Sequence, residues 1–134
     1  MSKHETWRTR KYWESVGGLL IEEFCAVRRS PFSGTRLIDG VIVLNEETRI
    51  HNSNYFDIKD RDVISIQTKQ SRLGMYLMGQ AFFSADLLEA FNPKSVKKVL
   101  ICGNNDEILY PICKKYNIEV VVIPDLDIQT KIDS

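Results

Sequence analysis

The chain has 134 residues, and its 18 Lys and Arg balance its 18 Asp and Glu, so the formal net charge is zero. A balanced charge excludes a global positive field that would draw nucleic acid or an anionic membrane to the whole surface. Hydrophobic residues make up 43% of the chain and charged residues 27%, fractions typical of a globular protein. We expect residues 1–134 to form one domain.

The cysteines and the start of the chain indicate a compartment. Cys25, Cys102 and Cys113 share no C-x-x-C spacing, which argues against a disulfide framework and against a zinc site. No signal-peptide pattern opens the sequence, and no apolar run has the length of a membrane span. These features predict a reduced, cytoplasmic protein without a membrane partner.

The first half of the chain is typical of one helix followed by strands. Residues 4–15 carry apolar positions at helical spacing and precede a Gly-Gly pair, which predicts a helix. Three apolar, β-branched segments predict strands: 19–27, 36–44 and 63–69. Pro31 and Gly34 mark a turn between the first two strands, and the polar segment 45–62 predicts a loop or an irregular hairpin.

The second half alternates between helix and strand. Apolar side chains recur at helical spacing over residues 71–91, with Ser71 as the expected N-cap and Asn92-Pro93 as the expected stop. The segments that follow predict a strand, a helix and a strand, in that order: 96–103, 105–116 and 118–123.

The predicted order of elements is therefore α-β-β-β-α-β-α-β. Consecutive strands form an antiparallel meander, whereas strands joined through helices are typical of parallel pairing. We predict an α/β fold with a mixed sheet flanked by helices, in which the strands 36–44 and 63–69 are adjacent and antiparallel.

Asp39 and Lys69 are charged residues in strands that are otherwise apolar. Strand alternation places Asp39 on the face of Val41 and Val43, where an unpaired ionised carboxylate is costly. If the two strands are neighbours, Asp39, Gln67 and Lys69 meet at one end of the sheet. Carboxylate and amide oxygens suit a hard cation such as Mg²⁺, and a lysine beside them stabilises charge that develops on a phosphate.

Four segments carry a resemblance to a known family: KYWE (11–14), RLID (36–39), ISIQTK (64–69) and SRLGMYLMGQ (71–80). A helix with a glutamate, a strand that ends in aspartate, a strand with a (D/E)-x-K pattern and a further helix resemble the PD-(D/E)XK nuclease superfamily. This is the superfamily of restriction endonucleases and archaeal Holliday-junction resolvases. The resemblance extends over roughly residues 4–103, and it implies a restriction endonuclease-like fold and a nuclease that cleaves DNA with Mg²⁺ or Mn²⁺.

The resemblance also implies a role for each matched residue. Glu14 corresponds to the acid of the first helix, which assists the attacking water. Asp39 corresponds to the central metal ligand, Gln67 to a second ligand, and Thr68 to a ligand through its backbone carbonyl. Lys69 corresponds to the catalytic lysine.

Two positions depart from the pattern of the family. Ile38 stands where the family name has proline, and Gln67 stands where an acid is usual. The glutamine keeps an acceptor oxygen but removes one negative charge, so we expect weak metal binding. Glu22 and Glu23 are alternatives to Glu14 as the assisting acid.

Three further residues are predicted to contact the substrate: Arg36, Arg72 and Gln80. Arginines hold phosphates, and Gln80 lies on the helix that follows Lys69. The alternative is that all three are ordinary surface residues. DNA is the expected partner, and the small size and neutral charge of the chain favour a homodimer that enlarges the contact surface.

Two other interpretations stay open. The first is a non-catalytic α/β binding module, because VLICGNNDE (99–107) combines a strand, a glycine turn and an acidic helix start that can hold an anion. The second is a nuclease fold that has lost metal binding through Gln67 and only binds DNA or protein. Retention of both Asp39 and Lys69 favours the active nuclease.

Overall fold

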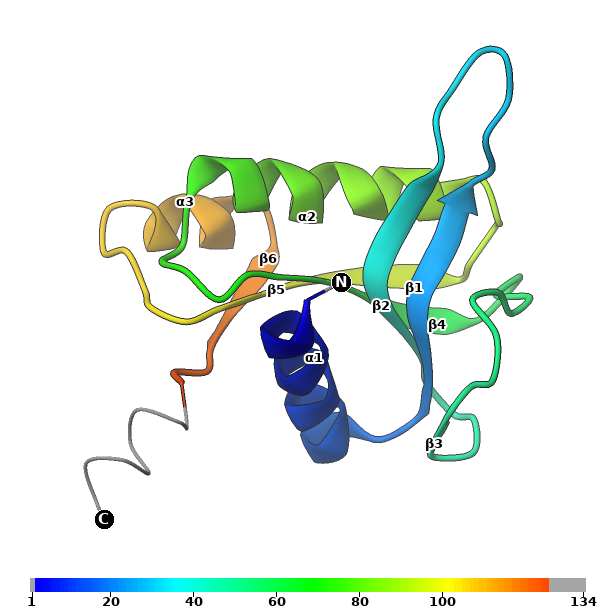
Figure 1. Ribbon diagram of the computed structural model, residues 1–134, viewed down its shortest axis with the longest axis horizontal. Helices are drawn as coiled ribbons and strands as arrows, with labels where there is room; N and C mark the ends of the chain where they lie inside the picture. Colours follow the sequence, from blue (N-terminus) through cyan, green and yellow to red (C-terminus); the bar gives the residue numbers. More distant parts are fainter. Residues whose placement is uncertain (1, 126–134) are drawn as a thin grey trace.

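A computed structural model of the chain, which describes residues 2–125, contains a six-stranded mixed sheet with helices on both faces (Figure 1). The elements in chain order are α1 (Lys3–Val16), β1 (Leu19–Val27), β2 (Arg36–Val43), β3 (Arg49–Ile50), β4 (Asp62–Thr68), α2 (Met75–Glu89), β5 (Ser95–Cys102), α3 (Tyr110–Lys115) and β6 (Ile118–Val122). The predicted α/β class is confirmed, while the restriction endonuclease-like assignment stays a prediction. No helix among the described residues is long and apolar enough to cross a membrane.

The strands lie in the order β3-β1-β2-β4-β5-β6. β1 pairs with β2, and β2 with β4, in antiparallel fashion, whereas β4, β5 and β6 are parallel to one another. The predicted antiparallel neighbours β2 and β4 are thus confirmed. The short β3, which pairs in parallel with β1, lies inside the polar segment that predicted only a loop or an irregular hairpin.

Each face of the sheet is covered by its own apolar cluster. On one face Tyr12 of α1 packs against Leu20 and Ile42 of the first two strands. On the other face Leu88 of α2 packs against Val41 of β2, and the N-terminal half of α2 packs with α3 over β5. Burial of these side chains is the main term that holds the three layers together.

Helix α2 begins at Met75, although the spacing predicted a start after Ser71. The Leu73 N–H donates to the Asn104 carbonyl at 2.8 Å, and the Gly103 N–H donates to the Ser71 carbonyl at 2.9 Å. The backbone between β4 and α2 is thus hydrogen-bonded to the turn after β5, so it does not form a helical turn. The predicted start was wrong because this contact is tertiary and leaves no local pattern.

Gly103 is required at the crossing between this segment and the end of β5. A Cβ at position 103 would lie 1.9 Å from the carbonyl oxygen of Gln70, so only glycine allows the two backbones to approach. The glycine turn of the 99–107 segment therefore has a packing role, and its N–H is engaged by Ser71.

Helix α3 is shorter than the predicted helix 105–116 and spans only Tyr110–Lys115. The Asp106 carboxylate accepts hydrogen bonds from the N–H groups of Ile108 and Leu109 at 2.9 and 3.0 Å. This turn occupies the residues that precede the helix, and Pro111 then lies in the first helical turn, where its missing N–H has no cost.

Candidate functional site

The candidate site lies where strands β2 and β4 separate. The two strands pair as far as Gly40 and Ile66. Beyond that pair the Asp39 carboxylate takes the place of a backbone acceptor, because its Oδ2 accepts a hydrogen bond from the Thr68 N–H at 2.9 Å. The carboxylate thereby connects the two strand ends while its other oxygen stays available for a ligand.

Strand alternation predicted that the Asp39 side chain lies on the face of Val41. The structure places it on the opposite face. Ile38 and Val41 belong to one apolar cluster on the α2 side, although they are three positions apart. A Cβ at Gly40 would instead meet Thr9 of α1. The alternation is therefore interrupted at Asp39 and Gly40, and both residues are turned towards the α1 side.

The same interruption occurs in the neighbouring strand. Ile21 and Phe24 of β1 both lie in the α2-side cluster, again three positions apart. Between them Glu23 has a φ of 49°, a left-handed conformation that non-glycine residues rarely adopt. Such interruptions increase local twist and redirect side chains, and they are frequent next to functional sites.

The ionisation of Asp39 is strongly perturbed. Burial raises the pKa of this carboxyl to about 6, the hydrogen bond from Thr68 opposes the rise, and the negative charge of Glu5 adds to it. The positive charge of Lys69 acts in the opposite direction and lowers the pKa. A carboxyl that titrates close to neutral pH between an acid and a lysine is typical of functional sites.

Lys69 and Glu5 line one hollow of about 450 Å³ at the first turn of α1, which we call the α1 hollow. The other lining residues are Ser2, Gln70, Ser71 and Asp125. Both Glu5 and Lys69 are partly buried. Thr68, Lys69 and Glu5 therefore lie close to Asp39, whereas the sequence predicted Lys69 and Gln67 beside it.

Glu14 lies away from these residues, contrary to the prediction that it faces them. It is exposed and lines a different hollow with Lys11 on the outer side of α1. Glu5 and Glu14 are nine residues apart, which corresponds to about 13 Å along an α-helix and to opposite helix faces. Only one of them can reach the place where β2 and β4 separate, and that residue is Glu5. Glu22, a further alternative, is paired with Arg10 at 2.8 Å.

The Gln67 side chain is directed away from the Asp39 carboxylate, although the sequence predicted that they converge. Its Nε2 donates to the Ser84 Oγ of α2 at 2.7 Å, and the side chain is buried. Residues 63, 65 and 67 of β4 face α2, so alternation places Gln67 there, while the interruption in β2 turns Asp39 the other way. The amide is held by the helix.

The predicted substrate-binding residues separate into two groups. Arg36 and Gln80 line one hollow of about 550 Å³ together with Gln67, which we call the α2 hollow. Arg72 is not in this group, because its Nη1 donates to the Asn105 carbonyl at 2.9 Å and so holds the turn after β5. This contact gives Arg72 a structural role that the sequence did not predict.

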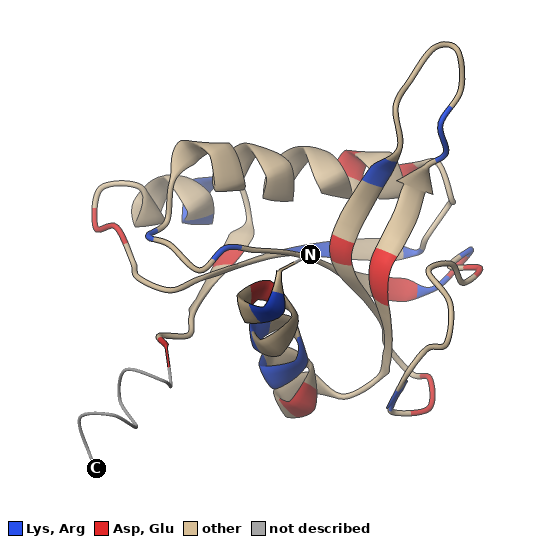
Figure 2. Cartoon of the chain, in the orientation of Figure 1, with Lys and Arg blue, Asp and Glu red and all other residues tan. Residues whose placement is uncertain are grey.

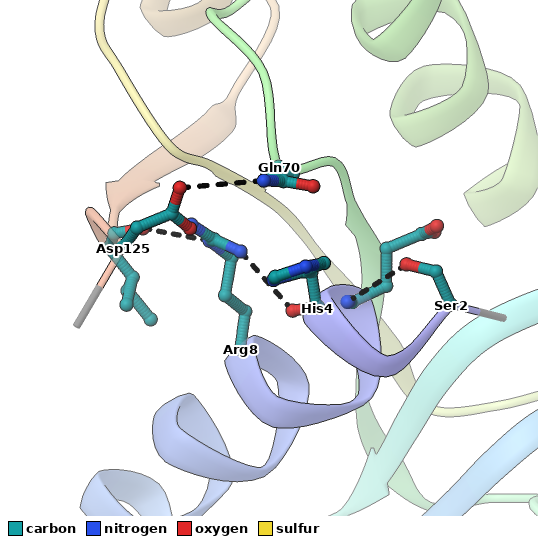
Figure 3. A network of polar contacts seen from close by, with 7 residues as sticks. Ser2, His4, Arg8, Gln70 and Asp125 are labelled. Carbon is teal, nitrogen blue, oxygen red and sulfur yellow. Dashed lines mark hydrogen bonds and ion pairs between the residues drawn. The ribbon is translucent and has the colours of Figure 1, made fainter. Parts of the chain in front are cut away.

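A buried arginine anchors the first turns of α1 and was not predicted from the sequence. Arg8 is fully buried and lies at the centre of the polar network of Figure 3. Its Nε donates to the Ile123 carbonyl at 2.8 Å, and its Nη2 pairs with Asp125 at 2.5 Å. Asp125 also accepts a weaker bond from Gln70, at 3.4 Å. The network joins the first turns of α1 to the segment that follows Lys69.

The oxygen atoms around Asp39 fit a hard cation. Asp39 and Glu5 supply carboxylates, and Thr68 has a buried hydroxyl without a hydrogen-bond partner. Within residues 2–125 no group of three His, Cys, Asp or Glu side chains could hold a metal ion. Mg²⁺ sites, however, are commonly built from one or two carboxylates completed by substrate phosphate and water.

Comparison of the chain with models of known protein families, with curated proteins and with solved structures gives no match in any of the three. Function must therefore be inferred from the chemistry of the residues around Asp39.

Proposed function

We propose that the chain is a divalent-metal-dependent nuclease that hydrolyses phosphodiester bonds in DNA. The observation that carries the proposal is the Asp39 carboxylate, which is partly buried where β2 and β4 separate, bonded to the Thr68 N–H and flanked by Lys69. A bound cation would stabilise the ionised form of this carboxyl, which burial destabilises. The order of elements and the D…x-K pattern support the same reading.

Three groups would hold Mg²⁺ or Mn²⁺ in this proposal. Asp39 is the anchoring ligand, and Glu5 supplies a second carboxylate from the first helix, on which the resemblance had placed Glu14 as the acid that assists the attacking water. The Thr68 carbonyl is the third, because the N–H and C=O of one strand residue point to the same neighbouring strand. When bound, the cation supplies Lewis-acid polarisation of a phosphate oxygen.

The remaining roles belong to side chains that act directly on the substrate. The Lys69 ammonium stabilises negative charge that develops on the phosphate, and its position at the α1 hollow gives it access to a ligand. Arg36 and Gln80, on the other side of β4, contact the DNA beyond the cleaved bond. Gln67 has a positioning role, since Ser84 holds its amide at the wall of the α2 hollow.

A homodimer is part of the proposal. Met75, Tyr76 and Phe83 on the outer side of α2 are 75, 75 and 65% exposed. At about 200 Å² per large side chain they expose about 400 Å², half of the area per partner in a stable interface. Residues 75–85 carry no charge, and the three side chains line the α2 hollow, so the dimer and the DNA contact by Arg36 and Gln80 are mutually exclusive at this surface. We expect a weak dimer by sedimentation velocity, monomeric after Phe83→Glu; a monomer at every concentration would exclude it.

The alternative function is a nuclease fold that binds nucleic acid without cleaving it. The observation that favours it is the loss of one acidic ligand, since Gln67 is neutral and bonded to Ser84. The two functions differ in one measurable respect. Both predict DNA binding, but only the nuclease requires a divalent cation for a chemical change in the DNA.

The test is a cleavage assay on linear duplex, branched and single-stranded DNA with Mg²⁺ or Mn²⁺ in the millimolar range, roughly that of weak oxygen-ligand sites. Lys69→Ala should abolish cleavage and leave metal binding intact, because the lysine is not a ligand. Lys59→Ala, an exposed lysine of the 45–62 segment, is the matched control and should cleave normally. Binding of DNA without cleavage by any cation would establish the alternative.

A further inference from the structure

The connection between β1 and β2 is a hairpin that projects away from the body of the molecule (Figure 1). Its arms are closed by the pairing of Val27 with Arg36, and the residues between them read RRSPFSGT. Except for Ser33, every residue from 28 to 36 is exposed. The hairpin therefore contributes little to the core, and another role must account for its composition.

The tip of the hairpin holds an aromatic ring in the open. Phe32 is 97% exposed, the largest exposure among the large hydrophobic side chains of the described residues. The Ser30 N–H donates to the Ser33 carbonyl at 2.9 Å, and the Phe32 N–H donates to the Ser30 Oγ at 3.1 Å. Pro31, with its fixed φ, stiffens the same turn. The ring is thus presented by an ordered turn.

The hairpin is also the most basic exposed segment of the N-terminal third. Arg28, Arg29 and Arg36 are exposed, and residues 28–36 contain no acid. Figure 2 shows blue segments on the hairpin, with the red segments of β1 and β2 lying closer to the body. Among the described residues none of the three arginines forms an ion pair. They are available to an anionic partner.

The hairpin is continuous with the candidate site. Arg36 precedes Asp39 by three residues in the same strand, a separation of about 10 Å. Phe32 precedes Asp39 by seven residues, so the Cα atoms of the two residues lie within about 23 Å of each other. This span corresponds to about six or seven base steps at 3.4 Å per step along one strand. A single nucleic acid ligand can therefore contact both the hairpin and Asp39.

We infer that the hairpin 28–36 is a nucleic-acid-binding arm whose arginines contact phosphates and whose Phe32 stacks on an unstacked base. An exposed aromatic ring beside arginines is the arrangement that binds single-stranded nucleic acid, since every base offers a face for stacking. The preferred substrate class is then DNA with unstacked bases, such as single strands, ends and branches. The inference rests on the proposed function for the identity of the ligand, and it deepens that function by naming its substrate class.

The test is a binding measurement that does not depend on cleavage. Fluorescence anisotropy with Asp39→Asn protein in EDTA should show tighter binding of a labelled single strand, or of a duplex with a single-stranded branch, than of the continuous duplex. Phe32→Ala should weaken binding of the first two by about 5- to 100-fold, the effect of losing one stacked base. Phe32→Trp should restore it. The salt dependence should stay unchanged in both variants.

The arginines are tested through the salt dependence of the same binding. Combined Arg28→Ala and Arg29→Ala should reduce the slope of log affinity against log salt by about 0.7 for each phosphate of a single strand that is no longer neutralised. Lys114→Ala with Lys115→Ala, an exposed basic pair on α3, is the matched control and should change neither slope nor affinity.

Two results would overturn the inference. One is unchanged affinity and unchanged preference in Phe32→Ala; the other is binding of the hairpin to anionic phosphatidylserine vesicles in place of DNA. Failure of the proposed function is distinguishable from both. DNA could bind through Phe32 and the arginines while no divalent cation supports cleavage by the wild-type chain. In that case the nuclease proposal is wrong, and the inference that the hairpin binds nucleic acid still holds.

Discussion

Replacing the Asp39 carboxyl by an amide should stabilise the protein at neutral pH. The amide of the Asp39→Asn variant is neutral, and it keeps an oxygen that accepts the Thr68 N–H, which the carboxylate accepts at 2.9 Å. The substitution therefore removes the buried charge and preserves the bond between the strand ends. A residue that destabilises its own fold is expected where function requires a particular chemistry.

The size of the effect follows from the pKa of Asp39, which burial raises from 3.8 to about 6. Each pKa unit corresponds to about 1.4 kcal/mol, so the ionised carboxylate costs the fold up to about 3 kcal/mol, and partial exposure reduces this to about 2 kcal/mol. Because the folded pKa lies above the unfolded one, the folded state holds the proton more tightly. The stability that the protonated Asp39 contributes is fully present below the unfolded pKa. It is lost as pH rises through the folded pKa of about 6.

The assay is urea denaturation of wild type and Asp39→Asn at a series of pH values in EDTA. The difference in unfolding free energy should be close to zero near pH 4 and should favour the variant by about 2 kcal/mol at pH 7 to 8. Asp86→Asn, at an exposed position on α2, is the matched control and should show no such dependence. A variant that is less stable than wild type at pH 8 would refute the reasoning.

Three further predictions concern the surroundings of the site. Gln67→Glu should lower the unfolding free energy at pH 7 relative to pH 4 by about 1 to 3 kcal/mol, because a buried carboxylate replaces an amide. Unchanged stability together with tighter Mn²⁺ binding in calorimetry would instead make residue 67 a metal ligand. Gly103→Ala should lower the unfolding free energy by about 1 to 3 kcal/mol, since the added Cβ meets a backbone oxygen at 1.9 Å. Gly79→Ala, which has open space around the added Cβ, should instead raise stability. Equal effects of the two substitutions in thermal denaturation would contradict this. Asp125→Asn should lower Tm at pH 7, because Arg8 lowers the pKa of Asp125. The difference should begin to shrink as pH falls through about 4, the unfolded pKa, and should vanish below the lower folded pKa; a difference that does not shrink with falling pH would point to a change in packing.

Local patterns in the sequence were sufficient for most of the architecture. Helix α1 ends at Val16 before Gly17, whose φ of 82° suits glycine, and the sequence predicted this stop. The start of α2 could not be predicted, because backbone bonds to Gly103 and Asn104 replace its first turn. Those bonds join segments that are about thirty residues apart in the chain, and periodicity carries no information about such distant pairs.

The candidate site was predictable in its residue types and less so in its geometry. Asp39 and Lys69 stand out because charges are rare in apolar strands, and the structure brings them together. The choice of Glu5 over Glu14 depends on which end of α1 lies at the site, which is a tertiary property. The direction of Gln67 depends on the interruption of alternation in β2. A left-handed Glu23 marks the same interruption in β1, and it has no signature in the amino-acid sequence.

The most direct test of the catalytic role of Asp39 is the rate at which labelled branched or single-stranded DNA is cleaved as Mn²⁺ is increased, for wild type and for Asp39→Asn. Both proteins must first be shown to be folded by the denaturation experiment above, in which the variant is the more stable. We predict that the wild-type rate rises with Mn²⁺ and that Asp39→Asn is slower by at least about 100-fold, the scale of losing one principal electrostatic contribution to a transition state. Equal rates for the two proteins, or no cleavage by the wild type at any concentration of Mn²⁺ or Mg²⁺, would contradict the claim that Asp39 anchors a catalytic cation.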